Sequence, residues 1–142
     1  MRIAIVYHSG TGNTKELAEE IHKFLPEAEL HRVLDFDLST IPDYDLLMIG
    51  TYTWGNGNIP RRMIPLYEAI EHMEVDNLFT VIFGTGESSY KYFCGAVDSF
   101  RNMLYHQTKL IATLKIEQRF QDTDVERIHK LCNLVRSKLT ED

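Results

Sequence analysis

The chain has 142 residues, which is enough for one domain with a substantial hydrophobic core. Fifteen Lys and Arg residues against 21 Asp and Glu residues give a net charge of −6, which does not favour binding to nucleic acid or to an anionic membrane. Hydrophobic residues at 44% and charged residues at 25% are typical of globular proteins and argue against collagen-like, coiled-coil and disordered chains.

Apolar stretches and cysteines narrow the class further. Ile3–Tyr7 and Leu46–Ile49 are far shorter than the ~20 residues of a membrane helix, and the amino-terminal stretch is too short for a secretory signal. Cys94 and Cys132 are separated by 37 residues, and the six histidines lack the spacing of a metal site. We therefore expect a cytoplasmic protein without a disulfide framework, a bound metal or a membrane segment.

Short apolar runs alternate with segments of helical periodicity, which is typical of strands joined by crossover helices. The first half of the chain predicts a strand at Ile3–Tyr7, followed by a helix whose apolar stripe is Leu17, Ala18, Ile21, Phe24 and Leu25. An edge strand is predicted at Glu29–Leu34 and an irregular connection or very short helix at Asp35–Asp43. A further strand is predicted at Leu46–Thr51. The second half of the chain predicts a helix that starts near Pro60 and has the apolar stripe Met63, Ile64, Leu66, Tyr67 and Ile70, followed by a strand at Leu78–Phe83. The next predicted helix has the stripe Ala96, Val97, Phe100, Met103 and Leu104, and a strand follows at Leu110–Ile116. The last predicted helix has the stripe Val125, Ile128, Cys132, Val135 and Leu139.

These elements predict an α/β fold with one parallel sheet between two layers of helices. Ligands of such sheets bind at the carboxyl edge, where the strand order reverses. We therefore expect the loops after the first, third and fourth strands to carry the functional residues.

The loop His8–Thr14 has the composition of a phosphate site. Ser9, Thr11 and Thr14 can each donate an O–H, and the free N–H groups and dipole of the following helix attract an anion. An ordinary strand-to-helix turn with capping hydroxyls is the alternative interpretation.

Other nucleotide motifs fit less well. No Gly-Lys dipeptide is present, so the P-loop pattern is absent, and the third glycine of a dinucleotide motif would fall at Lys15. Asp35 keeps a nicotinamide cofactor as a less favoured alternative, because it lies 23 residues beyond Gly12 and can contact a ribose.

Two further loops contain aromatic residues. Thr51–Asn58 carries the single tryptophan, Trp54, between polar residues and glycines, and Gly84–Tyr90 ends in Tyr90. Trp54 is either a lid over the end of the sheet or a plate on which a flat ligand stacks. Together, the three loops predict a phosphate site and two aromatic plates at one edge.

These segments together resemble the flavodoxins, small electron carriers that bind flavin mononucleotide (FMN). The matching motifs are Ile5-Val6-Tyr7-x-Ser9-x-x-Gly12-x-Thr14-x-x-x-Ala18-x-x-Ile21, Thr53-Trp54-Gly55 and Gly86–Asp98. The resemblance extends from Ile3 to the last helix. It implies a flavodoxin-like three-layer sandwich with strand order 2-1-3-4-5, in which residues 1–142 form one FMN-binding domain.

The resemblance also implies roles for individual residues. The phosphate would be bound by Ser9, Gly10, Thr11, Gly12, Asn13 and Thr14. Trp54 and Tyr90 would cover the two ring faces, and the ring edge would meet backbone groups around Thr85, Gly86, Glu87 and Cys94. The other expected cofactor contacts are Thr51, Tyr52, Thr53, Gly55, Asn56, Gly57, Tyr92 and Phe93. The Gly55–Asn56 peptide would turn when the flavin gains an electron.

The function implied is that of a low-potential electron carrier, a monomer without enzymatic activity that moves electrons between a reductase and a separate electron acceptor. A flavoenzyme of the same fold, such as a quinone or nicotinamide-linked reductase, is one alternative. A flavodoxin-like activator of ribonucleotide reductase is the other.

The chain departs from the family near the tryptophan. Asn56, Asn58, Arg61 and Arg62 stand where flavodoxins commonly have acidic residues. Because positive charge stabilises an added electron, we expect a less negative potential for full reduction of the flavin and a less acidic docking face.

Overall fold

The computed structural model describes residues 1–88 and 91–141 and contains a five-stranded parallel sheet in the order β2-β1-β3-β4-β5. The strands are β1 (Ile3–Tyr7), β2 (Glu29–Arg32), β3 (Leu46–Tyr52), β4 (Phe79–Gly86) and β5 (Lys109–Glu117). The α-helices are α1 (Asn13–Phe24), α2 (Ile64–His72), α3 (Gly95–Gln107) and α4 (Asp122–Thr140). The predicted fold class and strand order are therefore confirmed.

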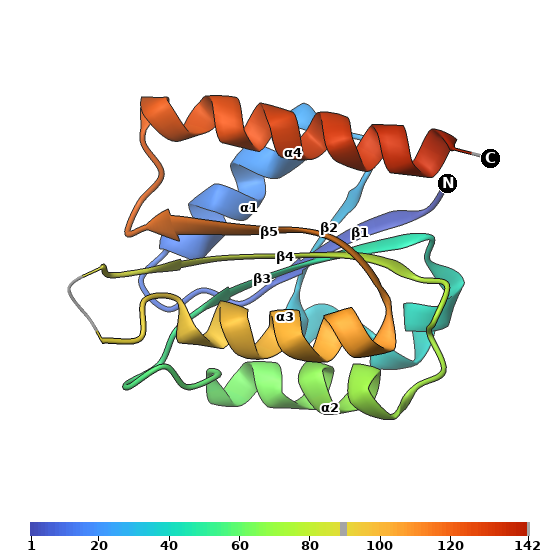
Figure 1. Ribbon diagram of the computed structural model, residues 1–142, viewed down its shortest axis with the longest axis horizontal. Coiled ribbons are helices and arrows are strands. Elements are labelled where there is room, and N and C mark those ends of the chain that lie inside the picture. The colour runs from blue at the N-terminus through green and yellow to red at the C-terminus, as the bar shows by residue number, and fades with distance from the viewer. Residues whose placement is uncertain (89–90, 142) are drawn as a thin grey trace.

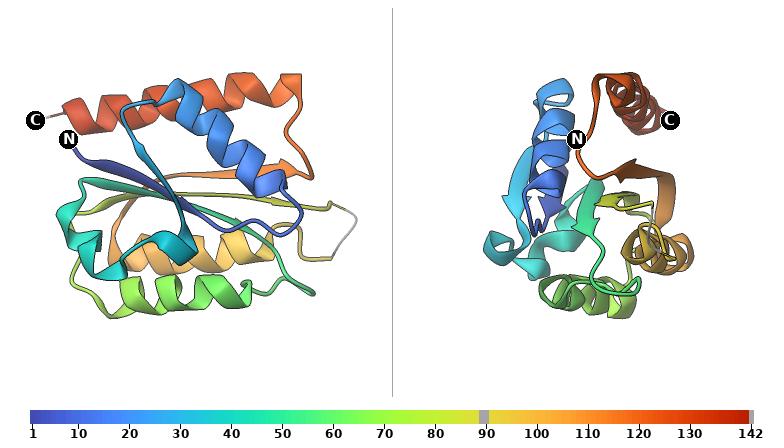
Figure 2. Two further views of the ribbon diagram at one scale, coloured as in Figure 1. Left: turned by 180° about the vertical axis from the view of Figure 1, so that it is seen from behind. Right: turned by 90° about the vertical axis from the view of Figure 1, so that its left-hand side faces the viewer.

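Helices cover both faces of the sheet. Figures 1 and 2 show α1 and α4 on one face and α2 and α3 on the other. Successive residues of a strand point to opposite faces, so Ile5 packs in the core beneath α1 and α4, whereas Val6 packs in the core beneath α2 and α3. Burial on both faces explains why β1 is an unbroken apolar run.

Strand β2 is shorter than predicted. It lies at the edge of the sheet, as expected, but it ends at Arg32, and Val33–Asp35 forms a 3₁₀ turn. The Arg32 guanidinium pairs with the Asp35 carboxylate at 2.8 Å across this turn. Val33 is buried in the core, whereas Leu34 is 57% exposed. The 3₁₀ turn therefore directs the Val33 side chain inward and leaves the Leu34 side chain at the surface. The expected short helix follows as a second 3₁₀ segment, Leu38–Asp43.

Strand β4 is longer than predicted. The apolar run Leu78–Phe83 predicts a strand that ends at Phe83, but β4 continues to Gly86. The reason is that β5 runs beside it and pairs Gly84 with Lys115 and Gly86 with Glu117. Thr85 and Gly86, expected in a loop, therefore lie on a hydrogen-bonded strand. The carboxyl ends of the strands meet at the left-hand edge of Figure 1, where the candidate site is built.

Candidate functional site

The loop between β1 and α1 forms a turn held by its own polar groups. The Gly12 amide donates a hydrogen bond to Ser9 Oγ at 3.0 Å, and Gly12 has a φ of 104°, a conformation that favours glycine. The Gly12 carbonyl then accepts the Glu16 N–H at 3.0 Å, which starts α1. The N–H groups of the first helical turn have no carbonyl partner within the helix, so they can donate to an anion.

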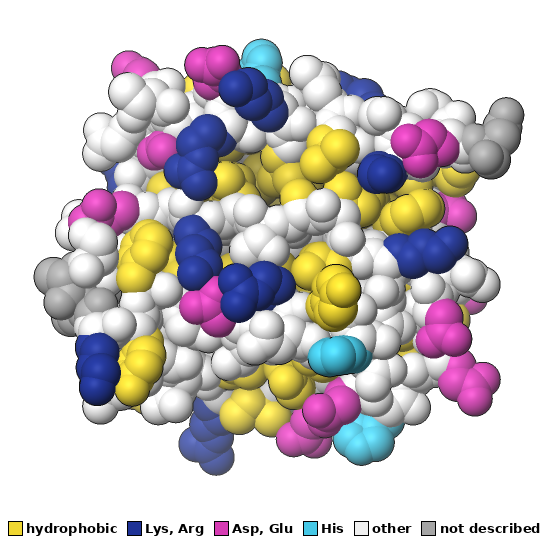
Figure 3. Space-filling view, in the orientation of Figure 1, with side chains coloured by type: hydrophobic (Ala, Val, Ile, Leu, Met, Phe, Trp, Pro, Cys, Tyr) yellow, Lys and Arg dark blue, Asp and Glu magenta, His cyan; other side chains and the backbone are white. Residues whose placement is uncertain are grey.

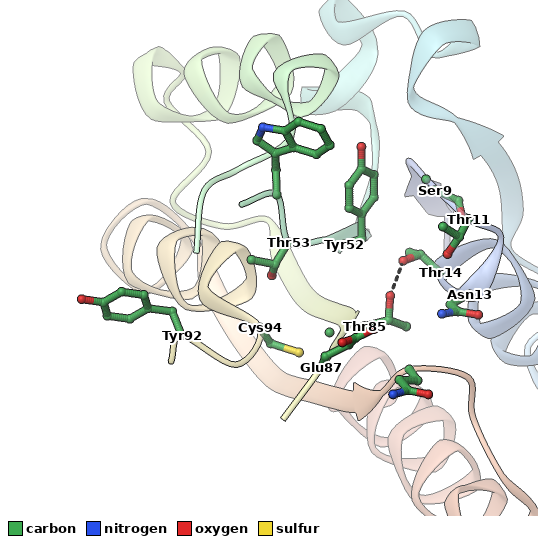
Figure 4. Close-up of a pocket in the computed structure, with 14 residues that line it drawn as sticks. Ser9, Thr11, Asn13, Thr14, Tyr52, Thr53, Thr85, Glu87, Tyr92 and Cys94 are labelled. Atoms are coloured by element: carbon green, nitrogen blue, oxygen red, sulfur yellow. Dashed lines mark hydrogen bonds between the residues drawn. The ribbon is translucent and has the colours of Figure 1, made fainter. Parts of the chain in front are cut away.

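Thr14 and Thr85 join the first turn of α1 to the end of β4. Their hydroxyls share a hydrogen bond of 2.7 Å, and both side chains are buried (Figure 4). The Thr14 hydroxyl, expected to bind a phosphate, thus already has a protein partner. Its shared hydrogen bond fixes the helix start against the strand end at the base of the site.

The loop after β3 presents Trp54 to solvent. Trp54 and Asn58 exchange two backbone hydrogen bonds, with the Trp54 amide donating at 2.8 Å and the Asn58 amide donating at 2.7 Å. The turn between them needs Gly55 and Gly57, whose φ angles are 52° and 93°. The Trp54 side chain is left 63% exposed, so its indole is available to a ligand.

This tryptophan loop packs against the start of α3. A Cβ on Gly57 would lie 2.8 Å from Tyr92 Cβ, and one on Gly95 would lie 2.7 Å from Gly57 Cα. Thr53 Oγ1 also accepts a hydrogen bond from the Ala96 amide at 3.2 Å. The loops after β3 and β4 therefore support each other, a contact that the sequence did not indicate.

Cys94 precedes α3 and lies against the end of β4. A Cβ on Gly86 would lie 3.0 Å from both the amide nitrogen and the Sγ of Cys94, so glycine is required for this close approach. Burial raises the pKa of the Cys94 thiol to about 12. The thiol is therefore protonated at neutral pH and does not act as a nucleophile or as a thiolate ligand.

These loops line one pocket of about 380 Å³, a size suited to a small-molecule ligand (Figure 4). Its lining residues are Ser9, Gly10, Thr11, Asn13, Thr14, Tyr52, Thr53, Trp54, Thr85, Gly86, Glu87, Tyr92, Cys94 and Gln118. Figure 4 shows Ser9, Thr11 and Asn13 on one side of the pocket and Cys94 on the other, with the Tyr92 ring directed away from its centre. All of these residues except Gln118 are among those predicted from the sequence.

Gln118 was missed because only the loops after the first, third and fourth strands were expected to matter. It follows β5 directly, with a φ of 54°, and its amide donates to the Gly86 carbonyl at 2.6 Å. Gln118 follows a predicted strand whose carboxyl end lies at the same edge of the sheet as the pocket. This position was the sequence signal that could have identified it.

Some predicted residues support the pocket without lining it. Gly12 turns the chain into α1, and Thr51 is fully buried in β3. Phe93 faces a separate hollow next to Lys115. Their contribution to the site is to hold the lining loops in position.

The turn next to Trp54 faces a neighbouring hollow. Gly55 and Asn56 border this hollow together with Lys91, and Gly57 is in contact with α3. Tyr90, predicted as the second aromatic plate, lies outside the described residues.

His8 does not line the pocket but lies next to the ring of Tyr52, with 5.5 Å between the ring centroids. Burial, and after it the positive charge of Arg62, lowers the pKa of His8 below its usual value. This lowered pKa favours the neutral imidazole over the charged form.

Residues 1–88 and 91–141 contain neither a candidate metal centre nor a helix that could span a membrane. In these ranges no cluster of three or more His, Cys, Asp or Glu side chains could hold a metal ion. The helices in the same ranges do not combine the length and the apolar character needed to cross a bilayer.

Comparisons with known proteins match the whole of this architecture. A family model described as Flavodoxin matches residues 5–130. Probable flavodoxin 1 of Bacillus subtilis is 39% identical over 129 residues, covering 86% of this chain and 82% of that protein. The crystal structure of oxidised Flavodoxin 1 from Bacillus cereus has a TM-score of 0.92 at 25% identity, and the match covers 99% of this chain and 100% of that chain.

A more distant structure shares the fold alone. Fusobacterium nucleatum flavodoxin bound to flavin mononucleotide has a TM-score of 0.83 at 16% identity, covering 96% of this chain and 98% of that chain. The family model spans the loops that build the pocket as well as the sheet that positions them, the Bacillus relatives cover most of the chain, and the chain therefore belongs to the flavodoxin family.

Proposed function

We propose that the chain is a low-potential electron carrier that binds one FMN non-covalently at the carboxyl edge of its sheet. The observation that carries this proposal is that the amino end of a helix and an exposed tryptophan line the same cavity of about 380 Å³. FMN carries both a phosphate and a flat aromatic ring whose faces can stack on an indole, so it requires both features.

The phosphate would bind at the amino end of α1. The hydroxyls of Ser9 and Thr11 and the amide of Asn13 line this part of the pocket, next to the free N–H groups of the first helical turn. The helix dipole adds about half a positive charge there. A dianion can therefore be held without a lysine.

The ring would bind between the tryptophan loop and the loop after β4. Trp54 would cover one face, and backbone groups of Gly86 and Cys94 would meet the ring edge, because all three line the pocket. Tyr90 is proposed for the other face on the basis of the sequence. When bound, FMN accepts and donates electrons one at a time, which the lining side chains do not do themselves.

The Gly55–Asn56 peptide is proposed as the backbone group that adjusts to the charge of the ring. Gly55 and Asn56 are both exposed, and the nearest atom to a Cβ built on Gly55 is Asn58 Nδ2 at 3.7 Å. A glycine at this exposed position allows the backbone to change conformation at little steric cost.

Membership of the flavodoxin family supports a carrier rather than an enzyme. We propose that residues 1–142 form one FMN-binding domain, a cytoplasmic monomer that moves electrons between a reductase and a separate acceptor protein. A monomer suits this role because each partner must use the same exposed edge in turn.

The binding proposal is tested by tryptophan fluorescence. Trp54 is the only tryptophan, so its emission reports on the proposed ring site directly. Adding FMN to the apoprotein should quench this emission with a 1:1 end point and a dissociation constant of about 1 μM or lower. Riboflavin, which lacks the phosphate, should bind at least about tenfold more weakly. Unchanged emission at micromolar FMN would rule out the proposed site.

The carrier role is tested on the FMN-loaded protein. NADH or NADPH alone should leave its flavin oxidised over many minutes. After a catalytic amount of a flavodoxin reductase is added, NADPH should reduce the flavin rapidly. Rapid oxidation of nicotinamide without the reductase would show an enzyme instead.

A further inference from the structure

A basic and apolar surface lies next to the pocket. It consists of Trp54, Ile59, Arg61, Arg62 and Ile64, which we call the arginine patch. These residues line a shallow hollow of about 480 Å³ that His8 and Tyr52 also reach. Trp54 is 63% exposed and Ile64 is 40% exposed, so the patch offers apolar contact area as well as charge.

The local sequence directs both arginines outward. Arg61 and Arg62 lie in a 3₁₀ turn between Pro60 and Met63, and the Met63 amide donates to the Pro60 carbonyl at 2.9 Å. Pro60 and Met63 are buried and anchor the turn, which leaves both guanidinium groups exposed. The arginines thus project from a rigid base at the start of α2.

The two arginines of the patch differ from the others in the chain. Six of the eight arginines form ion pairs with carboxylates: Arg2, Arg32, Arg101, Arg119, Arg127 and Arg136. Figure 3 shows Lys and Arg side chains beside Asp and Glu side chains over α3, α4 and β5. Within residues 1–88 and 91–141, Arg61 and Arg62 have no such partner, in a chain whose net charge is −6.

The patch is continuous with the candidate cofactor site. Trp54 lines the pocket, the hollow of the patch and a further hollow that Lys91 also lines. Trp54 therefore shares these two hollows with three cationic side chains, those of Arg61, Arg62 and Lys91. A protein bound to the patch would lie against the edge of the pocket through which electrons must leave.

We propose that the arginine patch is the docking surface for a redox partner whose contact surface carries carboxylates around an apolar centre. Guanidinium groups bind carboxylates with two parallel hydrogen bonds, and Trp and Arg often dominate the energetics of interfaces. The net charge of −6 repels an acidic partner over the rest of the surface, so the patch also orients its approach. A patch of five residues is small, which suits a partner that must dissociate after each transfer.

This inference rests on the proposed function, because it assigns the partner of the same electron carrier. Its test measures binding without electron transfer, using oxidised FMN-loaded protein and oxidised cytochrome c. Succinylated cytochrome c, which is anionic, represents the acidic partner. Native cytochrome c, which is cationic and has the same haem, is the comparison.

The test compares two double variants of equal charge. Arg61→Gln/Arg62→Gln removes the patch charges, and Lys109→Gln/Lys130→Gln removes two exposed charges at the amino end of β5 and on α4. Each changes the net charge from −6 to −6 − 2 = −8. Arg61 and Arg62 do not line the pocket, so unchanged FMN affinity shows that the variant is folded.

In calorimetric titrations at low ionic strength, the arginine variant should bind succinylated cytochrome c about tenfold more weakly than the wild type. The lysine variant should differ from the wild type by less than about twofold, and the effect of the arginines should fade at about 0.5 M salt. For native cytochrome c, removing the arginines should not weaken binding.

Equal losses in the two variants would overturn the proposal, because net charge alone would then explain binding. NADPH binding that only the arginine variant loses, with cytochrome binding unchanged, would overturn it in favour of a nucleotide site. A protein that binds no FMN but still binds succinylated cytochrome c through the arginines would instead contradict the proposed function, so the two failures are distinguishable.

Discussion

Gly86 marks a position where one methyl group should disturb the site. Gly86→Ala would put a Cβ 3.0 Å from the amide nitrogen and the Sγ of Cys94, so the segment before α3 must move. We expect destabilisation of about 1–3 kcal/mol, as for other overpacked sites, and at least about tenfold weaker FMN binding. Urea unfolding and the Trp54 titration measure the two effects.

A double variant identifies the source of this clash. Cys94→Ala removes the Sγ but leaves the amide nitrogen at the same 3.0 Å. Gly86→Ala/Cys94→Ala should therefore recover only part of the lost affinity. Full recovery would show that the thiol, and not the backbone, requires glycine at this position.

His8 predicts a pH dependence of stability in the apoprotein. Burial, and after it Arg62, lowers the pKa of His8 below its ordinary value of 6.5, so the unfolded chain binds a proton more readily than the folded one. The free energy of unfolding should therefore fall as the pH drops through 6.5 and level off below the pKa of the folded protein. Urea unfolding between pH 7.5 and 5 measures this slope.

Variants separate His8 from the other histidines. His8→Asn should reduce the slope, and Arg62→Gln should reduce it by a smaller amount, because it removes the second cause of the lowered pKa. His106→Asn, an exposed position on α3, serves as the control. The same slope in wild type and His8→Asn would contradict the assignment.

At the scale of an element, α1 is held at both ends by residues outside it. Gly12 turns the chain into the helix, and at the other end Arg136 of α4 donates to the Phe24 carbonyl at 2.6 Å. Arg136 also donates two hydrogen bonds to the Glu27 carboxylate, at 3.1 Å and 3.2 Å. A cation at a helix carboxyl end is favourable, so this contact joins α1 and α4 on one face of the sheet.

Arg136→Ala should lower the free energy of unfolding by about 0.5–1 kcal/mol at pH 7. The hydrogen bond with Arg136 lowers the pKa of Glu27, so its contribution is present above the usual pKa of 4.5 and is lost as the pH falls through the folded value. The difference between wild type and variant should therefore shrink at pH 3. Urea unfolding at the two pH values measures it.

Lys130→Ala is the matched control, because Lys130 pairs at 3.4 Å with Glu126 on the same helix and both side chains are largely exposed. It should change stability by less than about 0.5 kcal/mol. If Arg136→Ala and Lys130→Ala changed the free energy of unfolding equally, the contact of Arg136 with the end of α1 would add nothing to stability.

At the scale of the whole molecule, the distribution of charge sets the electrostatic potential at the cofactor site. Arg61 and Arg62 lie beside Trp54 and have no carboxylate partner among the described residues, whereas each of the other six arginines pairs with a carboxylate. Arg61→Gln/Arg62→Gln should therefore make the midpoint potential of full flavin reduction more negative by tens of millivolts, on the order of 1 kcal/mol.

A redox titration of the FMN-loaded protein measures this shift. Lys109→Gln/Lys130→Gln changes the net charge equally but lies away from the pocket, so it should shift the potential much less, and high salt should reduce both effects. Identical shifts in the two variants would contradict a local effect of the arginines.

The sequence by itself determined the fold class, the edge position of β2 and most residues that line the pocket. Buried parallel strands are unbroken apolar runs, and helices between them bury one stripe, so both leave a periodic pattern in the chain. Parallel strands also bring their carboxyl ends to one edge, which places loops distant in sequence around one site.

Only the tertiary structure decided how these loops hold one another. Thr14 and Thr85 are 71 positions apart, and their hydrogen bond exists because β1 and β4 lie in the same sheet. The close approach of Gly57 to Gly95 and the contact of Gln118 with Gly86 have the same origin. Such contacts join residues that share no local pattern, so only the folded arrangement of the strands brings them together.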